Sequence, residues 1–149
     1  MIGKAMAMVT GALVLSATAT AAGPVTHIDA DDVRAAFERG APLLESGTFK
    51  IHASRRDAPG EAEIHELDSD LIHVLEGTAT LVTGGSIVAG RATAPREIRG
   101  ESIRDGEPRR LAPGDVVVVP HGTPHWFREV GPPFLYYVVK VPTGTGEPR

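Results

Sequence analysis

The chain has 149 residues and a mass of 15.7 kDa, which is enough for one domain with a hydrophobic core and too little for two. Its net charge of −4 argues against a nucleic-acid partner, and the absence of cysteine excludes disulfides and thiolate metal sites. The 17 glycines and 12 prolines favour short strands joined by turns over a helical bundle.

Residues 1–22 have the pattern of a secretory signal peptide. Lys4 is the only charged residue, a run of small and apolar residues follows, and Ala19-Thr20-Ala21 or Thr20-Ala21-Ala22 suits signal-peptidase cleavage. A membrane anchor is the alternative, but the stretch is interrupted by Gly11 and by several serines and threonines. We therefore expect a secreted or periplasmic protein without stable membrane insertion after cleavage.

Residues 29–40 predict one short helix within an N-terminal extension that spans residues 23–47. Asp29 suits the N-cap position, and Gly40 followed by Pro42 ends the helical pattern. Apolar side chains recur at helical spacing on one face, at Val33, Ala36 and Phe37.

Residues 48–142 have the pattern of short strands separated by glycine and proline turns, and residues 143–149 form a polar tail that we expect to be flexible. Gly77 predicts a tight hairpin, and the four valines at 116–119 predict a strand buried on both faces. About eight to ten strands in one small domain favour a sandwich or a barrel. The predicted strands cover residues 48–55, 71–76, 78–83, 86–89, 116–119, 125–130 and 134–141, and the polar segment 90–110 adds one or two short strands.

Histidines and carboxylates stand at the starts of these strands. Glu63 and His65 are two residues apart on a predicted strand and therefore share one face. Asp70 begins the next strand, and His125 begins another strand after a proline-glycine turn. Together they form two spaced motifs, Glu63-x-His65-x4-Asp70-x6-Gly77 and Gly114-x5-Pro120-x-Gly122-x2-His125.

The two motifs resemble the signature motifs of the cupin superfamily, G-x5-H-x-H-x3-4-E-x6-G and G-x5-P-x-G-x2-H-x3-N, and the resemblance covers about residues 49–141. The second motif departs only at Glu129, which stands where the family has Asn. In the first motif, Asp57, Glu63 and Asp70 replace the leading Gly, the first His and the Glu. The resemblance implies an all-β double-stranded β-helix, a jelly-roll barrel, here with a short N-terminal helix. It also implies a divalent metal held by Glu63, His65, Asp70 and His125.

The replaced residues leave the metal chemistry open. Imidazole and carboxylate ligands suit Fe(II), Mn(II), Zn(II) or Ni(II), and binding by all four residues would cancel the charge of the ion. Asp70 is one methylene shorter than the Glu of the family motif, so it can contact the metal through a water molecule instead of directly. Glu63 is then the only carboxylate ligand, and two histidines with one carboxylate leave open coordination positions suited to Fe(II) and dioxygen. A barrel that binds no metal is the remaining alternative.

Other polar residues are assigned by strand alternation. His52, Tyr136 and Lys140 are candidates for the lining of a substrate pocket, whereas His73 is expected on the face opposite Asp70. Arg55 and Arg56 are expected to be solvated or to pair with Glu and Asp rather than to bind an anionic substrate, and the charge-mixed segment 97–110 is expected to be a solvated face.

The resemblance leads to two hypotheses of function. The first is an exported metal-binding cupin that binds and transforms a small organic molecule as a dioxygenase, isomerase or lyase. The alternative is a non-catalytic module that binds a metal or a small ligand. By analogy with the family, we expect a homodimer.

Overall fold

The computed structural model describes residues 23–143, so the predicted signal peptide and all but the first residue of the predicted tail lie outside the described residues. Within this range one helix and eleven strands are formed, and no helix is long and apolar enough to cross a membrane. The elements are α1 (Ala30–Arg39), β1 (Ala41–Glu45), β2 (Lys50–Arg56), β3 (Ala62–His65), β4 (Asp68–Thr83), β5 (Ser86–Val88), β6 (Arg91–Ala94), β7 (Glu97–Gly100), β8 (Ser102–Arg104), β9 (Glu107–Leu111), β10 (Val116–Val119) and β11 (His125–Pro142).

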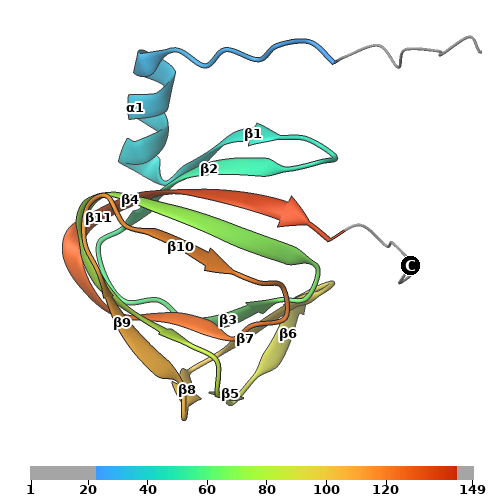
Figure 1. Ribbon diagram of the computed structural model, residues 1–149, viewed down its shortest axis with the longest axis vertical. Helices are drawn as coiled ribbons and strands as arrows, with labels where there is room; N and C mark the ends of the chain where they lie inside the picture. Colours follow the sequence, from blue (N-terminus) through green and yellow to red (C-terminus); the bar gives the residue numbers. More distant parts are fainter. Residues whose placement is uncertain (1–22, 144–149) are drawn as a thin grey trace, which may run out of the picture.

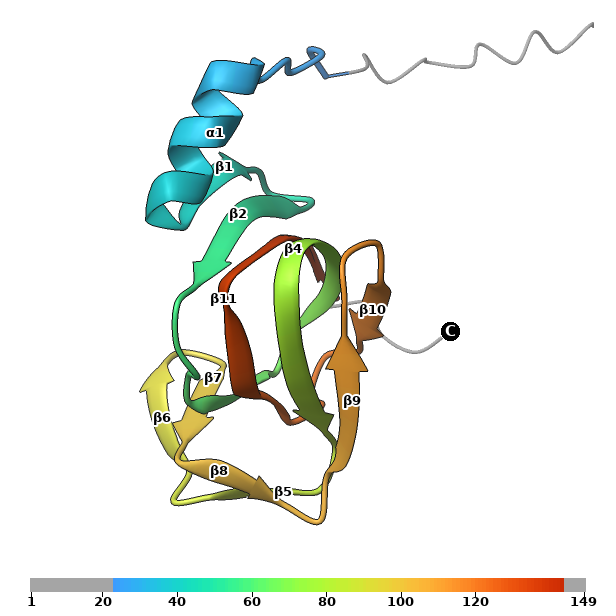
Figure 2. The same ribbon diagram turned by 90° about the vertical axis from the view of Figure 1, so that its left-hand side faces the viewer.

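The predicted helix is confirmed as α1, with the predicted residues at both ends. The Asp29 carboxylate accepts hydrogen bonds from the backbone N–H groups of Asp31 and Asp32, and Gly40 closes the helix in a left-handed conformation (φ 64°). Phe37 meets Tyr137 of β11 edge to face at 5.1 Å. Figures 1 and 2 show α1 beside β1 and β2, outside the curved sheet.

Strand β1 was not predicted, and Pro42, which helped to end the helical pattern, lies within it. Proline lacks a backbone N–H and is tolerated in edge strands, and β1 pairs with β2 alone. The pairing is irregular between Pro42 and Leu44. The strand therefore extends the sheet directly after the helix.

The two longest strands, β4 and β11, are antiparallel to each other along most of their length. Strand β4 also pairs with β9 and β10, and β11 also pairs with β2 and β3, which continues to β7 and β6. Strands β5 and β8 form a separate two-stranded sheet. Figures 1 and 2 show the strands curving around a common interior, with β5 and β8 at the end far from α1.

The predicted hairpin at Gly77 is wrong, because β4 runs through this residue as one strand. Gly77 has a left-handed conformation (φ 76°), and a Cβ atom there would lie 2.2 Å from the carbonyl oxygen of Pro133. The pairing register of β11 shifts opposite, between Gly131 and Leu135. Glycine therefore lets the two paired strands bend together here instead of reversing.

The prediction that the four valines are buried on both faces is also wrong. Val117 and Val119 face the core, but Val116 and Val118 are 59% and 61% exposed. Among the described strands β10 pairs only with β4, and α1 covers the sheet at β1 and β2 instead. The outer side of β10 thus presents apolar side chains to solvent.

The hydrophobic core lies on the inward faces of the paired strands β4 and β11, with contributions from β9 and β10. Phe127, Phe134 and Tyr136 form an aromatic group with ring centroids 5.0–5.5 Å apart. Aliphatic residues of β4 pack against it, and the largest fully buried ones are Ile72, Val74 and Leu81. Because β4 and β11 carry both core and polar inward-facing residues, the core fixes the position of the polar site beside it.

Candidate metal centre and its pocket

Strand pairing brings the four predicted ligands to one place. His125 at the start of β11 pairs directly with Glu63 of β3, and His65 follows on the same face of β3. Asp70 reaches the site from β4, where it pairs with Lys140 of β11. All four candidate ligands are buried, with 3–8% of each residue exposed.

The ligand atoms of these residues face one another at distances that are too long for hydrogen bonds. His65 Nε2 and His125 Nε2 lie 3.5 Å and 3.8 Å from Asp70 Oδ2, and His125 Nε2 lies 3.9 Å from Glu63 Oε1. Atoms bound at about 2.1 Å to one metal lie roughly 3.0 to 3.6 Å apart when adjacent and about 4.2 Å apart when opposite. The observed separations lie close to this range.

The outer ring nitrogens of both histidines have acceptors that orient the imidazoles. Glu97 oxygens lie 2.7 Å and 2.8 Å from His65 Nδ1, and the Thr123 carbonyl lies 3.0 Å from His125 Nδ1. A carbonyl only accepts, so His125 Nδ1 donates its proton, and in the neutral ring Nε2 presents a lone pair to the site. Burial lowers the pKa of His125, which favours this neutral form.

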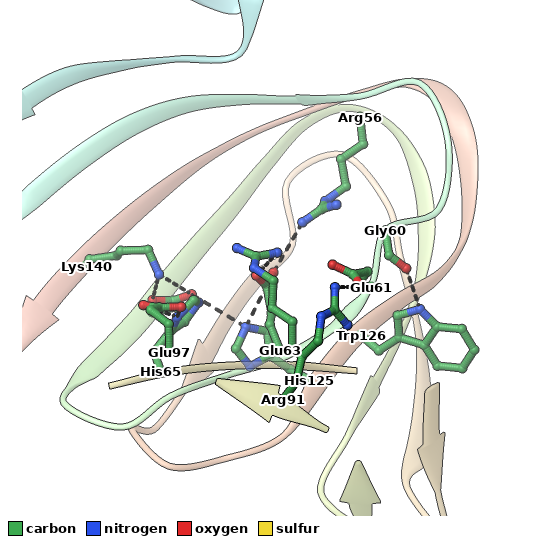
Figure 3. Close-up of polar contacts among 12 residues, drawn as sticks. Arg56, Gly60, Glu61, Glu63, His65, Arg91, Glu97, His125, Trp126 and Lys140 are labelled. Atoms are coloured by element: carbon green, nitrogen blue, oxygen red, sulfur yellow. Dashed lines mark hydrogen bonds and ion pairs between the residues drawn. The ribbon is translucent and has the colours of Figure 1, made fainter. Parts of the chain in front are cut away.

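Three cationic side chains surround the two carboxylates. Arg56 Nη2 and Arg99 Nη1 lie 3.3 Å and 3.0 Å from the two oxygens of Glu63, and Lys140 Nζ lies 2.9 Å from Asp70 Oδ1. Burial acts to raise the pKa of Glu63, but His125, Arg99, His65 and Arg56 together bring it below its usual value. Both carboxylates are therefore held in a strongly polar interior. Figure 3 shows Arg56 and Lys140 reaching this group from different sides.

Arg55 and Arg56 pair with Asp57 and Glu63, in agreement with the expected pairing. The expectation that the segment 97–110 is a solvated face is wrong for Glu97 and Arg99. Arg56 ends β2 pointing inward, while Glu97 and Arg99 of β7 pair in register with His65 and Glu63. The alternation in Glu97-Ile98-Arg99 was a signal that the two charged residues share a strand face. Nothing in the sequence showed that β7 pairs with β3.

Comparison with known proteins agrees with the motifs and the barrel. A family model described as Cupin matches residues 49–145. The chain belongs to the cupin family.

Solved structures support the predicted double-stranded β-helix. The protein BH2720 from Bacillus halodurans is similar with a TM-score of 0.55 and 16% identity, covering 85% of this chain and 87% of that one. NMB1881 from Neisseria meningitidis is similar with a TM-score of 0.52 and 14% identity, covering 78% and 99%. At these identities the likeness shows the fold alone. No curated protein matches this cupin.

The donor set of this cupin fits a divalent metal. Glu63, His65 and His125 each offer a ligand atom, and these three atoms lie within 4.8 Å of one another. Two imidazoles and one carboxylate on one side of an ion leave further positions open. Asp70 stands beside this triad, but the bond from Lys140 to Asp70 competes with a metal for the same carboxylate. The structure therefore accommodates either three or four protein ligands.

The predicted pocket residues His52, Tyr136 and Lys140 line one cavity together with the candidate ligands. The cavity has a volume of about 230 Å³, and the apolar part of its wall comes from Ile72, Phe127 and Val138. His52 Nε2 is buried and has no hydrogen-bond partner among the described residues. His73 is not part of this lining, in agreement with the predicted opposite face.

Proposed function

We propose that this cupin binds one divalent metal through Glu63, His65 and His125, with Asp70 as a fourth ligand or as its immediate neighbour. One observation carries the proposal: two buried imidazole Nε2 atoms face carboxylate oxygens at 3.5–3.9 Å, with no hydrogen bond between them. Their outer nitrogens are already engaged with Glu97 and Thr123. A metal ion satisfies all of these ligand atoms at once.

We further propose that the protein transforms a small organic molecule in the cavity. When bound, the metal would supply Lewis-acid polarisation of an oxygen atom of the ligand. Lys140 and Asp70 form an ammonium–carboxylate pair at the cavity wall, where they can hold or move a proton. This pair favours isomerase or lyase chemistry, which requires proton transfer, with dioxygenase chemistry as the second candidate.

The lining also distinguishes the catalytic proposal from a binding module. A closed ligand set surrounded only by apolar residues would favour storage or sensing of a metal. Here Lys140, Tyr136 and His52 place ionisable side chains around the cavity. Polar groups of this kind support a reaction and are not needed to retain an ion.

Measurement of metal content tests the proposed metal site. Purified protein is loaded with Mn(II), Fe(II), Zn(II) or Ni(II), dialysed and measured by elemental analysis, and affinities are measured by isothermal titration calorimetry. We expect one ion per chain, lost in His125→Gln and Glu63→Gln. His73→Gln is the matched control, because His73 lies on the opposite face of β4. Wild-type protein without stoichiometric metal would disprove the proposal.

A substrate screen tests the reaction. Metal-loaded protein is incubated with small organic acids, diones and phenols while oxygen consumption and solvent deuterium incorporation are recorded. We expect deuterium incorporation without oxygen consumption, and we expect its loss in Lys140→Gln. Oxygen consumption on Fe(II)-loaded protein would favour the dioxygenase candidate, and neither signal would favour the binding module.

We propose that the protein is exported and that it forms a homodimer. The composition of residues 1–22 supports export, and N-terminal sequencing of protein recovered outside the cytoplasm should begin near residue 22 or 23. Strand β10 supports pairing of two copies, because no described strand pairs with its second edge and Val116 and Val118 are exposed on its outer side.

A further inference from the structure

The cavity is richer in positive charge than the chain as a whole. The sequence carries a net charge of −4, yet three cationic side chains and only two carboxylates line the cavity. The cations are Arg56, Arg99 and Lys140, and the carboxylates are Glu63 and Asp70. A divalent metal bound in the same place would increase this excess. Glu97, 2.7 Å from His65 Nδ1, adds a third carboxylate beside the cavity, so it is the bound metal that would leave the site positive and favour an anionic ligand.

Arg56 is held in a fixed position and keeps unused donors. Its Nε donates to the Tyr136 hydroxyl at 3.0 Å, Nη2 donates to Glu63 Oε1 at 3.3 Å, and the guanidinium lies 4.7 Å from the centre of the Phe127 ring. A Cβ atom at position 60 would lie 2.4 Å from Arg56 Nη1, so Gly60 leaves room for this side chain. Arginine has five N–H donors, and these contacts occupy two of them. A preorganised guanidinium with free donors is suited to an oxyanion.

A second group of donors lies on the other side of the cavity. Lys140 Nζ contacts both oxygens of Asp70, which leaves at least one of its three N–H donors for a ligand. His52 Nε2 has no hydrogen-bond partner among the described residues, with the Glu45 carboxylate 3.9 Å away, and His52 pairs across the strands with Val138, two residues before Lys140. Figure 3 shows Lys140 and Arg56 on different sides of the candidate ligands. A small molecule beside the metal site can therefore meet a cation on either side.

We infer that the molecule bound in this cavity is a small oxyanion, a carboxylate or a phosphate, whose negative groups are bound by Arg56 and Lys140 beside the metal site. The inference rests on the proposed function for the place of the ligand. It adds the chemical class of the ligand, and it assigns specificity to two residues that do not ligate the metal. The volume of about 230 Å³ suits a compact molecule.

Matched charged and neutral probes test this inference. Malonate, its neutral diamide malonamide, and inorganic phosphate are titrated into Mn(II)-loaded protein and into protein stripped with a chelator. We expect malonate to bind at least about tenfold more tightly than malonamide to the loaded protein. Whichever of malonate and phosphate binds with the higher affinity shows whether the cavity prefers a carboxylate or a phosphate. This comparison uses wild-type protein and does not depend on the folding of a variant.

Three variants locate the binding groups. Arg56→Gln and Lys140→Gln should each weaken malonate binding at least about tenfold and leave malonamide binding unchanged. Arg104→Gln on β8 is the control, because Arg104 is exposed and lies outside the cavity lining. Elemental analysis of each loaded variant verifies that the metal is retained. Circular dichroism verifies the fold.

Two results would overturn the inference: equal affinities for malonate and malonamide, or malonate binding that neither variant weakens. The second result would mean that malonate only chelates the metal. Either can occur while one metal ion per chain is retained, which leaves the proposed metal site intact. If no metal binds, the proposed function fails. The preference of the metal-free protein for malonate over malonamide then still decides whether the cavity binds oxyanions.

Discussion

The carboxylate of Glu97 lies 2.7 Å from Nδ1 of His65, on the side of the imidazole that faces away from the candidate metal position. Glu97 belongs to β7 and pairs in register with His65 of β3. The contact fixes the ring orientation and increases the basicity of Nε2. The relationship makes Glu97 a positioning residue for the proposed metal site.

Removing this carboxylate should weaken metal binding without removing a ligand. We expect Glu97→Ala to lower the affinity for the metal by about 10- to 100-fold, measured by calorimetric titration. Glu101→Ala is the control, because Glu101 is exposed just after β7. An unchanged affinity in Glu97→Ala would show that the hydrogen bond does not position the ring.

Gly77 provides a test of the bend in β4. We expect Gly77→Ala to reduce the free energy of unfolding by about 2 to 5 kcal/mol, since it combines left-handed backbone strain with a clash against Pro133. Gly84→Ala is a matched control with a similar φ of 75° and no atom within 4 Å of the added Cβ. It should lose only about 1 to 2 kcal/mol in urea unfolding. Equal losses would show that the close contact at Gly77 relaxes freely.

The stability of the metal-free protein should depend on pH near neutrality. Burial lowers the pKa of both His52 and His125 from the usual value of about 6.5. The unfolded chain therefore binds more protons than the folded chain as the pH falls below this value, so the free energy of unfolding decreases on acidification. Urea unfolding at several pH values between 7.5 and 5.5 should show this loss.

His125→Gln and His52→Gln should each flatten this pH dependence. The lowered pKa of Glu63 acts in a separate window, because its stabilisation is lost as the pH falls from the usual carboxyl value of about 4.5 towards its value in the folded protein. If both variants keep the wild-type slope between pH 7.5 and 5.5, the two histidines are not responsible for it.

The proposed homodimer predicts a specific effect at the exposed side of β10. Val118→Lys places a charge on the outer face while leaving the inward-facing Val117 and Val119 in place. We expect the mass measured by light scattering to fall from two chains to one, while circular dichroism shows the same strand content as the wild type. Val25→Lys, at a valine that is 96% exposed ahead of α1, serves as a matched control for added charge. A wild-type protein that is monomeric would contradict the proposal.

The sequence was informative where structure depends on local pattern. The capping residues Asp29 and Gly40 defined the helix, and the spaced motifs identified four buried residues that meet in one site. Those motifs encode turns and strand alternation, which are local properties. The same alternation placed Tyr136 and Lys140 on one face, although it did not tell which face looks inward.

The sequence was uninformative where structure depends on pairing between distant strands. Arg99 reaches Glu63 only because β7 pairs with β3, and Arg56 points inward only because β2 pairs with β11. Gly77 has the local signature of a turn, but the long pairing of β4 with β11 continues through it. Val116 is exposed because none of the described elements covers the outer side of β10. The four-valine sequence alone cannot predict whether another element covers the strand.

Strand β11 begins at His125 and carries Lys140 near its other end, and both residues line the same cavity. A ligand that contacts the metal position and Lys140 therefore connects the two ends of one curved strand. Local opening of β11 would then require release of the ligand, so occupancy of the cavity should slow amide hydrogen exchange along the whole strand. Because β11 is long and curved, a ligand in this small polar cavity would link its two ends and stabilise the aromatic residues that lie between them.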